Sequence, residues 1–197
     1  MEPVLREMIT GVVMVGGQSR RMGRDKSAMV VDGITLAERA LVKLGPWCGQ
    51  VVFSGSPSCH PGSGHVFVED ILPGMGPLGG LYSVMKAVPS PHYLLLAVDM
   101  PEVPSMLLEA LSIHPFQGCV VPRDAEGRLE PLVARYPSTL LPAIESALEA
   151  GELALHRLFN DQNTHFLDYQ NYGIIPYDLL NLNEPGEWKA YRDKRKS

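Results

Sequence analysis

Residues 11–26 read Gly11-Val-Val-Met-Val-Gly-Gly-Gln-Ser-Arg-Arg-Met-Gly-Arg-Asp-Lys26. The apolar run from Val12 to Val15 predicts a buried strand, and the pair Gly16-Gly17 ends it in a loop. The cations of that loop are Arg20, Arg21, Arg24 and Lys26. Paired glycines let backbone N–H groups approach a ligand closely, and clustered cations favour an anion. The loop therefore indicates polyphosphate binding, with an ordinary turn bearing solvated arginines as the alternative.

Two common phosphate-binding patterns do not describe this loop. Asp25 stands before Lys26-Ser27 where a Walker A motif needs glycine, and the loop has no G-x-G-x-x-G. That second pattern does occur at residues 74–79, with Asp99 about twenty residues further on, as in dinucleotide-binding enzymes. The match does not follow its strand directly and two prolines stiffen it, so we favour the first loop over an NAD or FAD site.

Strand and helix patterns alternate through the first half of the chain. Strands are expected at 51–54, 65–68 and 93–98, and helices at 35–44, 78–87 and 104–111. This alternation predicts an α/β fold of Rossmann-like type, a mostly parallel twisted sheet with helices on both faces. Ligands bind beyond the carboxyl ends of such strands. The residues expected at those ends are Gly16, Gly17, Ser54, Asp70 and Asp99.

The second half of the chain is less regular. Strands are expected at 119–122, 131–136 and 165–167, with helices at 140–150 and 153–159 and a final helix carrying the basic tail. No repeat or linker interrupts the 197 residues, and hydrophobic content is 45%. We therefore expect one domain over 1–197.

Composition narrows the partners and the location. The formal net charge of −5 and the separation of aromatic from basic residues argue against nucleic acid. Three widely spaced cysteines without a C-x-x-C pair support neither a zinc site nor a disulfide framework. No apolar run reaches the length of a membrane span, and the N-terminus does not resemble a signal peptide. A cytoplasmic protein that binds no membrane is expected.

Asp99 and two asparagines are the remaining candidates for ligand binding. Asp99 ends the most apolar strand and is well placed to hold Mg²⁺ against phosphate oxygens; capping the next helix is the alternative. Asn181 and Asn183 either bind a ligand or cap the last helix.

The first loop also resembles the signature of the nucleotidyltransferases that include molybdenum cofactor guanylyltransferase, roughly L-A-G-G-x-S-x-R-M-G-x-D-K. Met14-Val15 stand where Leu-Ala is usual. Further similar stretches follow in family order: Gly76-Pro-Leu-Gly-Gly80, Val98-Asp-Met-Pro101, Glu130-Pro-Leu-Val-Ala134, Gly151-Glu-Leu-Ala-Leu-His-Arg157 and Asn181-Leu-Asn183-Glu-Pro. Together they span nearly the whole chain.

The resemblance implies transfer of GMP from GTP to molybdopterin or Mo-molybdopterin, with release of pyrophosphate and with Mg²⁺ as cofactor. It implies a nucleotide-binding part at about 9–112 and an acceptor-binding part at about 113–197. The implied catalytic residues are Arg21, Lys26 and Asp99, the last as metal ligand. The implied nucleotide contacts are Met14, Val15, Gly16, Gly17, Lys26, Ser54, Asp70, Gly76, Gly80 and Asp99. Asn181 and Asn183 would face the acceptor or the metal, and molybdenum-cofactor insertion proteins are a further implied partner.

One departure bears on the choice of base. Guanine-specific members can carry Asn at the end of the second strand, where this chain has Ser54. A cytidylyltransferase using CTP is therefore the near alternative. A non-catalytic nucleotide-binding module on the same fold is a second, from another class.

Overall fold

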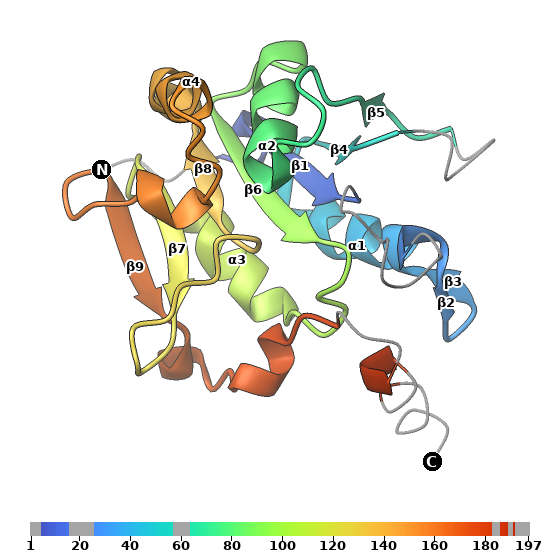
Figure 1. Cartoon of the computed structure of the whole chain (residues 1–197). Coiled ribbons are helices and arrows are strands. Elements are labelled where there is room, and N and C mark those ends of the chain that lie inside the picture. Colours follow the sequence, from blue (N-terminus) through green and yellow to red (C-terminus); the bar gives the residue numbers. More distant parts are fainter. Residues whose placement is uncertain (1–4, 16–25, 57–63, 183–185, 189–190, 192–197) are drawn as a thin grey trace.

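The computed structural model describes residues 5–15, 26–56, 64–182, 186–188 and 191 (Figure 1). Seven strands of the described chain form one sheet in the order β5-β4-β1-β6-β8-β7-β9. These strands are β1 (Ile9–Met14), β4 (Gln50–Ser54), β5 (Phe67–Val68), β6 (His92–Ala97), β7 (Cys119–Arg123), β8 (Arg135–Pro137) and β9 (Thr164–Asp168). A small antiparallel pair, β2 (Val30–Val31) and β3 (Ile34–Thr35), lies outside it.

The longer helices are α1 (Leu36–Leu44), α2 (Gly76–Ala87), α3 (Ser105–Ile113) and α4 (Leu141–Glu149). Short 3-10 helices are η1 (Arg6–Met8), η3 (Lys26–Ala28), η4 (Gly45–Trp47), η6 (Ser138–Leu140), η7 (Leu155–Leu158), η8 (Tyr169–Tyr172) and η9 (Pro176–Leu179). None of the described helices is long and apolar enough to cross a membrane.

The sheet is mostly parallel. β1 pairs in parallel with β4 and with β6. β4 and β5 also pair in parallel, and so do β7 and β9. β8 alone runs antiparallel, between β6 and β7. The α/β fold with a mostly parallel sheet, predicted from the alternation of patterns, is confirmed.

Both faces of the sheet are covered, because side chains alternate along each strand. Val13, Leu94 and Leu96 point to the face that packs against α1 and α3. Val12, Tyr93 and Leu95 point to the opposite face, which packs against α2 and α4 (Figure 1). Two apolar cores, one on each face, hold the central strands in place.

The start of α1 was predicted at Thr35, and the structure gives the reason. The Thr35 hydroxyl accepts from the Glu38 N–H at 3.1 Å, and the Glu38 carboxylate accepts from the Thr35 N–H at 2.7 Å. This reciprocal capping box satisfies two N–H groups that the first helical turn leaves without partners.

The second half departs from the expected elements in two places. Residues 153–159 were expected to be helical, but only η7 forms there, and no side chain caps it. The strand expected at 131–136 is replaced by a turn at residues 131–133 followed by β8. The turn is closed by the Val133 N–H, which donates to the Glu130 carbonyl at 3.2 Å. β6 still binds this segment, since Leu95 and Ala97 donate N–H groups to the Ala134 and Leu132 carbonyls.

Arg135, the first residue of β8, has a fully buried side chain. Its guanidinium donates to the carbonyls of Ser112 at 3.0 Å and His114 at 2.9 Å, and also to the carbonyl of Phe116. Burial lowers the pKa of Arg135 to about 10, so the group remains charged at neutral pH. The charged guanidinium therefore connects the end of α3 and the segment that leads to β7 through their carbonyl groups.

Replacing Arg135 by Met is expected to lower the free energy of unfolding by about 3 kcal/mol or more, because three carbonyls lose a donor in the interior. Lys86→Met is the matched control. Lys86 pairs with Glu145 at 3.3 Å on the surface, and its loss should cost under about 1 kcal/mol. Urea denaturation measures both, and equal effects would contradict the role given to Arg135.

Candidate active site

The carboxyl ends of β1, β4 and β6 lie side by side. Met14, the last residue of β1, is opposite Ser54 of β4 on one side and Ala97 of β6 on the other. Beyond the strands, the Val15 N–H donates to the Ser54 carbonyl and the Val98 N–H to the Met14 carbonyl, each at 3.2 Å. The chain leaves β1 toward β4, while β6 lies on the other side of β1. Ligand sites of open α/β sheets form at such a change of direction.

Three of the predicted nucleotide-binding residues meet around a fourth, Gly80, in the second turn of α2. A Cβ atom at Gly80 would lie 2.5 Å from Ser54 Oγ, 2.9 Å from Met14 Cε and 3.6 Å from Asp70 Oδ1. Only glycine allows the helix to come this near to the strand ends without moving these side chains. Sequence separates these residues widely, and the fold brings them together.

Asp70 reaches this cluster from the loop after β5. Its side chain is partly buried, and burial raises the pKa of the carboxyl above its ordinary value. Within the described part of the chain its carboxylate has no hydrogen bond or ion pair. A partly desolvated carboxylate with open lone pairs is suited to accept hydrogen bonds from a ligand.

Asp99 lies just past the end of β6, two residues after Ala97. The capping alternative is wrong, because α3 begins at Ser105 and its N-cap residue is Pro104. The Asp99 carbonyl accepts the Leu182 N–H at 2.9 Å, which brings Asn181 beside the Asp99 loop. Asn181 Oδ1 is buried and has no hydrogen-bond partner in the described residues. The backbones of Asp99 and Leu182, from distant parts of the chain, are thus brought together one residue from Asn181.

The structure describes the other predicted site residues only in part. Val15 is partly buried directly after β1, and Gly76 opens α2 with φ of 61°. The backbone of Lys26 begins η3. Gly16, Gly17, Arg21 and Asn183 lie outside the described residues, as does the side chain of Lys26.

The G-x-G-x-x-G pattern at residues 74–79 has a packing role. β5 ends at Val68, so the pattern does not follow its strand directly as a dinucleotide site requires. Gly79 allows close contact within the loop and helix start, since a Cβ there would lie 2.6 Å from the Met75 Cβ. The pattern therefore allows the first turn of α2 to pack closely against the loop that precedes it.

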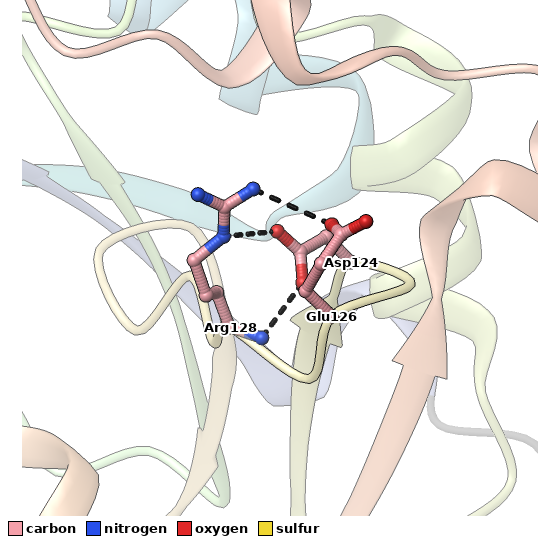
Figure 2. A network of polar contacts seen from close by, with 3 residues as sticks. All are labelled: Asp124, Glu126 and Arg128. Carbon is pink, nitrogen blue, oxygen red and sulfur yellow. Dashed lines mark hydrogen bonds and ion pairs between the residues drawn. The ribbon is translucent and has the colours of Figure 1, made fainter.

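A charged group that sequence reasoning missed lies at the same edge of the sheet, where β7 and β9 end. Arg123 and Asp168 pair at 2.8 Å. Asp124, with its side chain 5% exposed, accepts from the Arg128 N–H at 2.7 Å and from its Nε at 2.6 Å, while Glu126 also faces Arg128 (Figure 2). The groove at this place is lined by Arg123, Asp124, Ala125, Glu126, Gly127, Asp168, Gln170 and Asn171. The strands expected at 119–122 and 165–167 carried a signal for this charged group, because residues that follow parallel strands share one edge of the sheet.

Replacing Asp70 by Asn is expected to raise the melting temperature at pH 7. The folded state holds a partly desolvated carboxylate whose pKa is raised, so its ionisation costs stability at pH values above that pKa. The gain should disappear as the pH falls toward about 4, where the carboxyl of the unfolded chain also becomes protonated.

Asp124→Asn is the control of opposite sign, because it weakens the contact with Arg128 and should lower the melting temperature. Thermal melting of both variants between pH 4 and 7 makes the comparison, with the pH range taken from the carboxyl pKa values. A lower melting temperature for the Asp70 variant at pH 7 would contradict the desolvation argument.

Comparison with known proteins identifies the family to which the chain belongs. Residues 11–165 match the MobA-like NTP transferase domain. A probable molybdenum cofactor guanylyltransferase of Chloroflexus aggregans is 34% identical over 194 residues, covering 92% of each chain. A molybdenum cofactor guanylyltransferase of Syntrophotalea carbinolica is 30% identical over 191 residues, covering 93% of this chain and 90% of the relative.

Solved structures agree on the fold. The crystal structure of molybdopterin-guanine dinucleotide biosynthesis protein A from Archaeoglobus fulgidus superposes with a TM-score of 0.76 at 23% identity, covering 95% of this chain and 98% of that one. A 2-C-methyl-D-erythritol 4-phosphate cytidylyltransferase from Thermus thermophilus gives 0.68 at 18% identity, covering 94% and 98%. The chain belongs to the MobA-like NTP transferase family and is a nucleotidyltransferase.

Proposed function

We propose that this enzyme transfers GMP from GTP to molybdopterin, or to its molybdenum-bound form, with release of pyrophosphate. The observation that carries the proposal is the meeting of Met14, Ser54, Asp70 and Gly80 at the ends of β1 and β4. The guanylyltransferase names of relatives that match over nine-tenths of the chain support it.

The transfer needs no covalent bond to the protein. A phosphate oxygen of the acceptor attacks the α-phosphorus of GTP in line, the bond from that phosphorus to the bridging oxygen breaks, and pyrophosphate leaves. The protein contributes positioning and charge neutralisation. We assign the strand-end residues Met14 and Val15, with Gly16 and Gly17, to the nucleotide, and Arg21 and Lys26 to the phosphates and the leaving group.

The donor set beside β6 suits Mg²⁺. The Asp99 carboxylate and the buried Asn181 Oδ1, which has no hydrogen-bond partner in the described residues, are both oxygen donors of the kind that Mg²⁺ prefers. Mg²⁺ bound there would neutralise charge on the phosphate oxygens. We therefore propose Asp99 as its protein ligand and Asn181, the chain neighbour of Leu182, as a second oxygen donor.

The open carboxylate of Asp70 favours a nucleotide rich in donors. Guanine offers the adjacent N1–H and N2–H donors, which one carboxylate can accept together, whereas the pairing edge of cytosine has one donor group, the N4 amine, beside acceptors at N3 and O2. The ribose hydroxyls are common to GTP and CTP. We therefore favour GTP over the CTP of the cytidylyltransferase alternative, with Ser54 completing the pocket. ITP, which lacks the N2 amine, and 2′-deoxy-GTP distinguish contact with the base from contact with the ribose.

The acceptor is assigned to the second part of the chain, at about 113–197. Its strands β7 and β9 end at the same edge as β6, and Asn181 approaches Asp99 from the C-terminal side. Asn181 and Asn183 are proposed to face the acceptor, and molybdenum-cofactor insertion proteins are the proposed recipients of the product.

Asp99→Asn is expected to lower kcat/KM at least about 100-fold, because an amide neutralises a metal ion poorly. Glu109→Gln, an exposed carboxylate on α3, is the matched control and should leave activity unchanged. Mass spectrometry measures the dinucleotide formed from molybdopterin, Mg²⁺ and either GTP or CTP. Product mainly from CTP would move the enzyme to the cytidylyltransferase reaction. Full activity of Asp99→Asn would remove Asp99 from the proposed metal site. No product from either nucleotide would favour a non-catalytic module.

Gly80→Ala is expected to raise the KM for GTP about tenfold or more while the protein stays folded. The new methyl group displaces Ser54 Oγ and Met14 Cε, both movable ends of side chains that line the proposed pocket. Gly45→Ala is the control, since nothing lies within 4 Å of a Cβ at that position. Steady-state kinetics with melting curves make the comparison. An unchanged KM for Gly80→Ala would remove this cluster from the nucleotide site.

A further inference from the structure

Ser83 joins α2 to the loop that carries Asp70. The residue is fully buried, in the helical turn that follows Gly80. Its hydroxyl donates to the Gly79 carbonyl at 2.7 Å and accepts the Ile71 N–H at 2.9 Å. Both functions of the hydroxyl are therefore used, one inside the helix and one across to the loop.

The contact acts on the residue next to Asp70 in the chain. Asp70 has no hydrogen bond or ion pair in the described residues that would hold its carboxylate. Its Oδ1 would lie only 3.6 Å from a Cβ at Gly80, three residues before Ser83. The hydrogen bond between Ile71 and Ser83 is therefore a direct tie between the Asp70 loop and the helix that shapes the pocket.

The stability cost of losing this tie is small. Ile71 is 53% exposed and its hydrogen bond to Ser83 is only partly buried, so water can replace the Ser83 hydroxyl at the Ile71 N–H. Removing the hydroxyl thus lets the loop move while the core remains. The Ser83 hydroxyl therefore affects the position of the Asp70 carboxylate more than the stability of the fold.

We infer that Ser83 is a positioning residue for the nucleotide site: its hydroxyl holds the Asp70 loop against α2 and so sets the carboxylate for the donors of the bound nucleotide. The inference rests on the proposed function and adds to it the device that orders Asp70. Ser83 itself touches no reacting atom.

The experiment compares Ser83→Ala with Ser112→Ala. Ser112 is also buried in a helix, where its hydroxyl donates to the Glu109 carbonyl at 2.8 Å. Ser83→Ala is expected to raise the KM for GTP about tenfold with kcat changed less than about twofold, while Ser112→Ala changes neither. If Ser83→Ala folds poorly, Ser83→Cys tests the same point, because a thiol of similar size is a weaker hydrogen-bonding group and should give an intermediate KM.

A double variant separates positioning from general loss of structure. In an Asp70→Asn background, adding Ser83→Ala should raise KM by less than about twofold, because the group that Ser83 places has been changed already. Effects that multiply, or equal KM values for Ser83→Ala and wild type, would overturn the inference. If the wild type forms no product, the proposed function fails, and GTP affinity by calorimetry with the same variants still tests Ser83.

Discussion

The hydrogen-bonded register of β4, β1 and β6 is the constraint on which the site depends. Because the three strands are parallel and in register, Ser54, Met14 and Ala97 stand next to each other where the strands end. The loops beyond them then begin from fixed points, and Asp99 follows two residues after Ala97. A shift of one residue in any of these pairings would turn every side chain to the other face and bury the wrong set.

The approach of α2 to this edge is the second condition. Glycines at 79 and 80 and the small buried Ser83 let the helix start pack closely on its own loop and on the strand ends. The same closeness takes part of the solvent from Asp70, whose raised pKa records an unfavourable environment for its charge. Folding energy from the two apolar cores outweighs this local cost, as is common where a protein keeps a group ready for a ligand.

Much of the fold could be predicted from local patterns. Residues that are close in the sequence determine the apolar runs of β1 and β6 and the capping box at Thr35. These features can therefore be predicted from the sequence alone. Parallel strand ends then predict which loops share an edge, and the approach of Asp70 to Ser54 and the β1 end follows from that rule.

Features that depend on tertiary contact could not be predicted. β8 became short because its register is set by β6 and by the turn at Glu130 to Val133, and η7 remained a single turn without a cap. Nothing in the local sequence shows that the guanidinium of Arg135 ends beneath α3, or that Ser83 binds Ile71. The strand-end rule places Arg123 and Asp168 at one edge of the sheet, but their ion pair also requires β7 and β9 to be neighbours, which the rule does not give.

The insertion of β8 between β6 and β7 also affects how the chain can fold as it is synthesised. β6 is buried along its whole length, and one of its edges is completed only by residues 132–137, which leave the ribosome after β7. Until then a nascent chain presents an apolar strand with open N–H and C=O groups, the kind of edge that recruits other chains. Arg135, the first residue of β8, also binds the end of α3, so the same residue takes part in closing the edge and in anchoring the preceding helix.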